Sequence, residues 1–177
     1  MAKHPSPAQH EQVSGSVEET QALGERLGRL LRPGDVVALY GELGTGKTTL
    51  VQGIAQGMGL PPEAIKSPTF VLMREYPAGA ATLVHIDGYR LGGAPAAAWL
   101  DLEFMFSPRR VTLIEWAERF DGLLPPDHLE VRLEHVSTNR RRLTLVAHGA
   151  RAGAMAAQAA AVPSGAQDTI GDAAAGD

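Results

Sequence analysis

The segment at residues 41–48, GELGTGKT, is the feature that most limits what this chain can fold into. It fits the pattern G-x-x-x-x-G-K-[ST] of the phosphate-binding loop in nucleoside-triphosphate enzymes. Residues 36–40 form a short apolar run with β-branched side chains, which predicts a buried strand, and residues 48–58 predict a helix. A glycine-rich turn between a strand and a helix directs backbone N–H groups and the helix N-terminus at an anion. This context favours a phosphate site over a chance match.

Two side chains of this loop add chemistry of their own. Lys47 supplies a full positive charge for the β- and γ-phosphates, and the Thr48 hydroxyl is placed to ligate Mg²⁺. Lys47 is expected to lie on the solvent side of the loop until a nucleotide arrives. The loop therefore predicts a nucleoside triphosphate with Mg²⁺ as the ligand.

Two acids stand at the ends of other apolar runs. Glu115 lies at the end of the run 111–116, and a phosphate-loop enzyme needs such an acid to hold Mg²⁺ or to orient the attacking group. The alternative is an acid that merely leaves the sheet into solvent. Asp87 ends the run 81–87 and could be a second such acid, a general base or a group that positions water; a turn cap is its alternative.

Four other polar or aromatic features allow more than one interpretation. The hydroxyls of Ser67 and Thr69 could sense the γ-phosphate as switch loops do, or belong to an ordinary turn. We expect His85 to be packed or at the surface rather than catalytic, and Trp116 to be core. Residues 140–142, three arginines, are more typical of a solvated hairpin than of an RNA contact.

The remaining patterns predict a small α/β domain with a mixed sheet. Ser16 and Glu19 form a capping box at the start of a helix that carries an apolar stripe of leucines. The other predicted elements are a hairpin of residues 70–76 and 81–87, a weakly patterned helix at 94–106, a central strand at 111–116, and a closing antiparallel pair at 129–133 and 143–146.

Composition sets the expected limits of this domain. Residues 1–14 are rich in polar residues and proline, and we expect them to be flexible; residues 150–177 are mostly alanine and glycine, and we expect them to be disordered. The folded P-loop domain is then residues 15–149. The net charge of −4, the absence of cysteine and the lack of a long apolar run predict a cytoplasmic protein with no membrane contact.

One absence narrows the nucleotide. Guanine-specific proteins carry an [NT]-K-x-D element, but the chain has a single asparagine, Asn139, and lysines only at positions 3, 47 and 66, none of them in that context. A GTPase is therefore disfavoured.

Four motifs in this order give the chain a resemblance to a known family. They are GELGTGKTT at 41–49, SPTF at 67–70, HIDGYRL at 85–91 and IEWA at 114–117, and together they resemble TsaE (also called YjeE), the bacterial ATPase family of tRNA threonylcarbamoyladenosine synthesis. Gly88 and Ala117 stand where this family often has leucine and proline.

The resemblance implies a fold and a set of site residues. The fold would be a P-loop NTPase-like, three-layer α/β domain, with a mixed, largely parallel central sheet and antiparallel strands at its edge. Thr48 and Glu115 would hold Mg²⁺, and Glu115, Asp87 and Lys47 would be catalytic. The residues that would bind ATP are Gly44, Thr45, Gly46, Lys47, Thr48, Thr49 and Thr69.

The resemblance also implies partners. TsaB and TsaD would transfer the threonylcarbamoyl group to the adenosine beside the tRNA anticodon, and the ATPase would support their turnover and meet tRNA only through them. Two other functions remain open. A small-molecule kinase uses the same loop, and a nucleotide-binding adaptor would bind the nucleotide without hydrolysing it. Kinases usually close an arginine-bearing lid over the phosphates. Beyond Arg109 and Arg110 the sequence offers little of this kind, which favours the ATPase.

Overall fold

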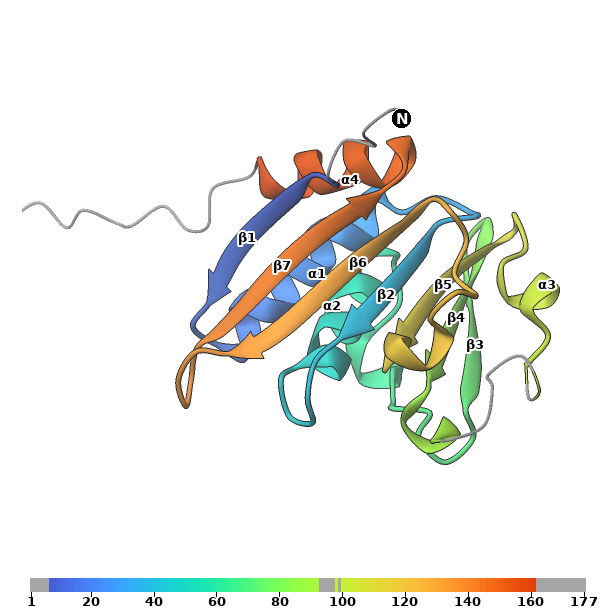
Figure 1. Cartoon of the computed structure of the whole chain (residues 1–177), viewed down its shortest axis with the longest axis horizontal. Coiled ribbons are helices and arrows are strands. Elements are labelled where there is room, and N and C mark those ends of the chain that lie inside the picture. The colour runs from blue at the N-terminus through green and yellow to red at the C-terminus, as the bar shows by residue number, and fades with distance from the viewer. Residues whose placement is uncertain (1–6, 93–97, 99, 162–177) are drawn as a thin grey trace, which may run out of the picture.

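The computed structural model describes residues 7–92, 98 and 100–161. Its centre is a seven-stranded sheet in the order β1-β7-β6-β2-β5-β4-β3 (Figure 1). The strands are β1 (Gln9–Ser14), β2 (Val36–Tyr40), β3 (Met73–Ala78), β4 (Ala81–Asp87), β5 (Arg110–Glu115), β6 (His128–His135) and β7 (Arg141–His148). The α-helices are α1 (Val17–Leu30), α2 (Lys47–Gly57), α3 (Leu102–Met105) and α4 (Ala150–Ala160).

The sheet is parallel in the middle and antiparallel at both edges. The four inner strands β6, β2, β5 and β4 are parallel to one another. At the edges, β3 pairs antiparallel with β4, β7 with β6 and β1 with β7. This arrangement confirms the predicted mixed α/β fold. Because the carboxyl ends of β2, β5 and β4 meet at one edge, the segments that follow them are brought together there.

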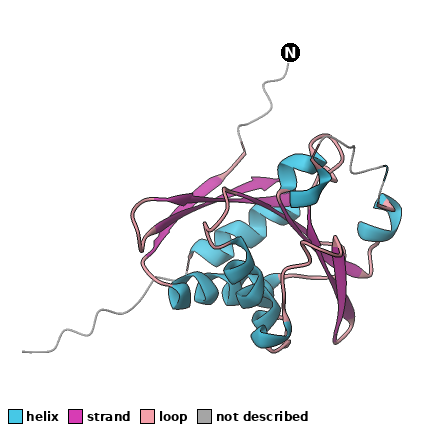
Figure 2. Ribbon diagram, turned by 90° about the horizontal axis from the view of Figure 1, so that it is seen from below, coloured by secondary structure: helices cyan, strands magenta, loops and turns pink. Residues whose placement is uncertain are grey.

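Alternating side chains give the sheet two apolar faces. In β2, Val37 and Leu39 face a core shared with α1, α2 and α4, whereas Val36 and Ala38 face a smaller core. The short segments α3, η2 (Tyr89–Leu91) and η4 (Ala117–Phe120) cover this second face. Most of the helical residues therefore lie on one side of the sheet (Figure 2).

The helices α1 and α2 pack with their backbones nearly touching. A Cβ at Gly28 of α1 would lie 2.1 Å from the Ile54 carbonyl oxygen, and one at Gly53 of α2 would lie 2.2 Å from the Gln21 carbonyl oxygen. No side chain fits at these two positions. α2 follows the phosphate loop directly, so this contact fixes the loop relative to α1.

The two ends of the domain differ from the expected limits. β1 lies in the segment expected to be flexible, yet its backbone pairs along its full length with β7. α4 lies in the segment expected to be disordered, yet it buries Ala152, Met155, Ala156 and Ala159. A packed helix of small residues needs little apolar area of its own when a sheet supplies the rest. Residues 1–6 and 162–177 of the two expected tails lie outside the described residues.

Two inner elements also differ from the predictions. The first strand of the hairpin begins at Met73 rather than at residue 70, and it continues through Pro77 to Ala78. Of the helix expected at 94–106, the described part contains only the single turn α3; residues 93–97 and 99 lie outside the description. No helix in the described part of the chain is long and apolar enough to cross a membrane.

Candidate nucleotide-binding site

The phosphate loop has the backbone of an anion nest. Gly44 and Gly46 adopt positive φ angles of +79° and +102°, which residues with a Cβ rarely take. α2 begins immediately afterwards at Lys47. The free N–H groups of its first turn therefore point out of the helix at the loop.

Lys47 is turned inward, and the expectation of a solvent-side lysine is wrong. Its side chain donates to the carbonyl oxygens of Gly41 (2.5 Å) and Glu42 (2.8 Å). Its Nζ also lies 4.3 Å from the ring centroid of Trp116, and the residue is only 5% exposed. Burial lowers the pKa of Lys47, while the nearby carboxylates of Glu115, Glu118 and Asp87 oppose that change. The Lys47 ammonium group therefore binds carbonyl oxygens of the loop, where a bound nucleotide would offer it phosphate oxygens.

Glu115 is held at the carboxyl end of β5 by two neighbours. The Thr48 hydroxyl donates to both carboxylate oxygens, at 3.0 and 3.2 Å. His85 Nε2 lies 2.8 Å from Glu115 Oε1, in a buried contact. The other ring nitrogen of His85, Nδ1, has no hydrogen-bond partner among the described residues.

His85 is packed, one of the two places expected for it, but sequence reasoning missed its contact with the site carboxylate. The sequence did contain a sign of this contact. Residues two apart in a strand share a face, so His85 points to the same side of β4 as Asp87. Trp116, expected in the core, is instead half-buried between Lys47 and Tyr89, whose ring centroid lies 5.1 Å away. Its φ of +57° is a strained conformation of the kind found at functional sites.

Asp87 gathers the hydroxyls of the SPT segment. Thr69 and Ser67 donate to its Oδ2 at 2.7 and 3.1 Å, and the backbone N–H of Tyr89 donates to Oδ1 at 2.9 Å. Asp87 and Glu115 are paired in register across β4 and β5. Gly88 permits the turn beyond Asp87, since a Cβ there would lie 2.9 Å from the Trp116 carbonyl oxygen.

Most of the predicted site residues line one pocket of about 430 Å³. Thr45 is the exception, because its hydroxyl turns back to the Glu42 carbonyl oxygen and the residue lines an adjoining pocket. The shared pocket contains Gly44, Gly46, Lys47, Thr48, Thr49, Thr69, Asp87 and Glu115.

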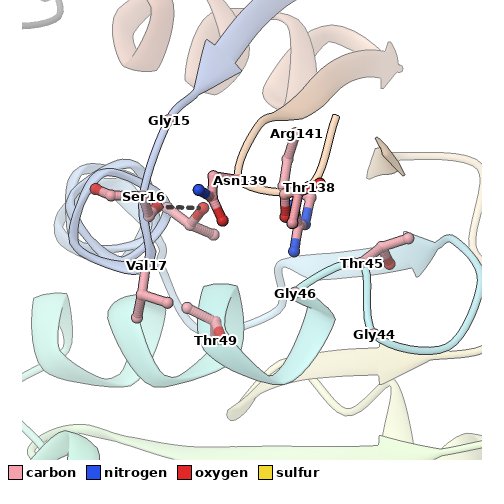
Figure 3. Close-up of a pocket in the computed structure, with 11 residues that line it drawn as sticks. Gly15, Ser16, Val17, Gly44, Thr45, Gly46, Thr49, Thr138, Asn139 and Arg141 are labelled. Carbon is pink, nitrogen blue, oxygen red and sulfur yellow. Dashed lines mark hydrogen bonds between the residues drawn. The ribbon is translucent and has the colours of Figure 1, made fainter. Parts of the chain in front are cut away.

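The adjoining pocket has about 450 Å³ and shares the glycines of the phosphate loop (Figure 3). Ser16 and Val17, at the start of α1, line one side, and Thr138, Asn139 and Arg141, from the β6–β7 turn, line the other. Sequence reasoning missed this wall, since residues 16 and 139 are far apart in the chain. The Arg140–Arg142 cluster was expected to be a solvated hairpin, and Arg141 nevertheless lines this pocket.

Large exposed apolar side chains lie in the lining of the phosphate pocket and next to it. Leu43 and Tyr89 line the pocket, and Phe70 and Val71 directly follow Thr69 of its lining. Leu43, Phe70, Val71 and Tyr89 are 75%, 80%, 53% and 48% exposed. The Arg90 guanidinium lies over the Phe70 ring, 4.5 Å from the ring centroid. Exposed apolar groups clustered beside a site are typical of a protein-interaction surface.

The arrangement suits a nucleoside triphosphate. The nest and Lys47 offer positive charge, the Thr48 hydroxyl and the Glu115 carboxylate offer the oxygen ligands that Mg²⁺ prefers, and Asp87 offers a second carboxylate on the same side.

Known proteins resemble this chain in sequence and in structure. The family model described as threonylcarbamoyl adenosine biosynthesis protein TsaE matches residues 14–143. The tRNA threonylcarbamoyladenosine biosynthesis protein TsaE of Bacillus subtilis is 36% identical over 134 residues, which cover 76% of this chain and 83% of that protein. Its namesake from Streptomyces coelicolor is 45% identical over 115 residues, covering 63% and 76%. The crystal structure of Bacillus subtilis YdiB has a TM-score of 0.74 at 30% identity, covering 89% of this chain and 97% of that one.

Proposed function

Since this chain belongs to the TsaE family, we propose that it binds and hydrolyses ATP in the biosynthesis of threonylcarbamoyladenosine in tRNA. The observation that carries the proposal is the convergence of two carboxylates, Glu115 and Asp87, on the pocket of the phosphate loop. A loop that only anchored a phosphate would not need both.

Each residue has a role in this proposal. The backbone N–H groups of residues 44–49 bind the β-phosphate, and Lys47 exchanges its two carbonyl partners for β- and γ-oxygens. Thr69 donates to the γ-phosphate. The base and ribose occupy the adjoining pocket between Ser16 and Asn139, which opens from the same glycines.

Thr48 and Glu115 would hold Mg²⁺, which when bound neutralises charge on the β- and γ-phosphates. His85 keeps the Glu115 carboxylate aimed at Thr48. Asp87 orients the attacking water and accepts its proton as the bond to the γ-phosphorus forms. The leaving group is ADP.

The chain's partners are TsaB and TsaD, through which it meets tRNA, in the cytoplasm. Among the described residues, no arginine lines the pocket that contains Lys47 and Glu115. The exposed apolar side chains of Leu43, Phe70 and Tyr89 support docking of a partner beside this pocket. Hydrolysis by the isolated chain should therefore be slow and rise when the partners order or complete the site.

The test is phosphate release from ATP by the chain alone and with the TsaB–TsaD pair. We expect a stimulation that can reach about 10³-fold, and no stimulated hydrolysis by Lys47→Ala, whose ATP binding in calorimetry should also be lost. Circular dichroism checks that this variant stays folded. An absence of hydrolysis in both conditions would sink the proposal, and unchanged ATP affinity in Lys47→Ala would remove the site assignment.

A further inference from the structure

Two histidines and a glutamate lie together at the end of the sheet away from the phosphate loop. His128 is the first residue of β6, which runs parallel to β2, and β2 carries the loop at its opposite end. His128 and His148 are cross-strand partners, and Glu130 follows two residues after His128 on the same face. This face is the one opposite α1 and α2, since Leu129 and Val131 pack on the helical side.

The three side chains already converge. One ligand atom from each residue can be chosen so that all three atoms lie within 4.8 Å of one another. The imidazole rings stack at 4.4 Å with an interplanar angle of 13°, and His148 Nε2 lies 2.8 Å from Glu130 Oε2. Ligand atoms around a tetrahedral Zn²⁺ are about 3.3–3.5 Å apart, given bond lengths of about 2.0–2.2 Å. Because a metal ion lies in the plane of each imidazole that binds it, the two rings would turn out of their near-parallel stack to direct one nitrogen each at the ion.

The surroundings prepare these groups to coordinate. His128 Nδ1 donates to the Pro125 carbonyl oxygen at 2.7 Å, which leaves the Nε2 lone pair free, as in histidine ligands oriented by a second hydrogen bond. Arg132 binds Glu130 Oε1 and leaves Oε2 directed at His148.

We propose that His128, Glu130 and His148 form a binding site for a divalent transition-metal ion, with Zn²⁺ as the best match to two imidazoles and one carboxylate. A water molecule completes the coordination. The ion joins β6 to β7 at the point where the chain leaves the sheet for α4. It is separate from the Mg²⁺ proposed at Thr48, and it does not depend on the proposed ATPase activity.

The test is a calorimetric titration of Zn²⁺ into the full chain without an affinity tag, with no nucleotide present. We expect one ion per chain, a rise in the melting temperature, and visible absorption of a Co²⁺ complex that Mg²⁺ does not displace. His148→Gln and Glu130→Gln should weaken binding at least tenfold. The matched control is His135→Gln, an exposed histidine at the other end of β6, which should bind as the wild type does.

Glu115→Gln separates this site from the catalytic carboxylate and should also bind Zn²⁺ unchanged. A second readout needs no substitution: Zn²⁺ should protect His128 and His148, but not His135, from acylation by diethyl pyrocarbonate, as mapped by mass spectrometry. Unaltered affinity in His148→Gln, equal acylation with and without Zn²⁺, or no stoichiometric binding would each overturn the proposal.

Discussion

At the scale of single residues, the site contains a buried contact between His85 and Glu115, in which His85 itself has no role in binding ATP or Mg²⁺. His85 is completely buried, and its Nε2 meets Glu115, which in turn meets the hydroxyl of Thr48. Burying a polar ring costs free energy unless it is hydrogen-bonded. Glu115 gains a fixed orientation from this contact, so His85 is a positioning residue.

Removing that contact should reduce hydrolysis more than binding. We expect His85→Leu to lower partner-stimulated phosphate release about 10–100-fold, the usual cost of losing an outer-shell partner. ATP affinity in calorimetry should remain close to that of the wild type, because the phosphate loop is untouched. His85→Gln, whose amide can donate as Nε2 does, should recover part of the rate. Equal rates in the leucine and glutamine variants would contradict this role.

At the scale of elements, the backbone contact between α1 and α2 supports the site from behind. α2 starts at the phosphate loop, and α1 starts beside the adjoining pocket, which its N-cap Ser16 lines. Gly28 and Gly53 set the distance between the two helices. A change in that distance would move both walls of the nucleotide site.

Gly28→Ala should therefore destabilise the protein and weaken nucleotide binding. Its added methyl would meet the Ile54 carbonyl oxygen at 2.1 Å, and overpacking of this kind costs about 1–3 kcal/mol. Gly153→Ala in α4 is the matched control, because no atom outside its own helix lies within 4 Å of the added methyl. It should gain about 0.5–1 kcal/mol from helix propensity alone. Urea unfolding measures the stability of both variants, and calorimetry measures their affinity for ATP. Equal changes of stability in the two variants would exclude the close-packing explanation.

Sequence patterns predicted the elements whose information is local. The predicted strand at 81–87 and the predicted helix after Ser16 agree with β4 and α1. Alternation and capping depend only on residues that are close together in the sequence. The strand expected from residue 70 begins later, since Leu72 takes a positive φ of +67° and its carbonyl accepts from Asp87 N–H. No local sequence pattern predicts that conformation of Leu72.

In the candidate site, too, local features could be predicted from the sequence, whereas contacts between distant segments could not. The phosphate loop is a contiguous motif, and the two acids end apolar runs, so one sequence was enough to suggest them. The pairing of His85 with Glu115 and the pocket wall at Asn139 arise only when β4, β5 and the β6–β7 turn are brought together. Periodicity places a side chain on a face but does not say what it meets there.

At the scale of the whole molecule, the two ends of the described chain complete the sheet and its helical layer. β1 covers the edge of β7, and α4 packs against the same face of the sheet as α1. Asp127 accepts from the N–H groups of Arg151 and Ala152 and so caps α4 from the loop before β6. The Arg151 side chain donates to both carboxylate oxygens of Asp35, at 3.2 and 2.8 Å, and ties α4 to the turn before β2.

Removing α4 should therefore cost far more than its alanine-rich sequence suggests. We compare a chain ending at Ala161 with one ending at Gly149, so that the two differ only by α4 and Ala161. The shorter chain loses the buried Met155, worth about 1.5–3 kcal/mol alone, together with three buried alanines and the Arg151–Asp35 pair. It also uncovers part of the apolar core that α4 shares with the sheet and α1. We expect a loss of at least about 3 kcal/mol in urea unfolding, and new binding of a hydrophobic dye. If both chains unfold at the same urea concentration, α4 is not part of the cooperative domain, and residue 149 is its limit after all.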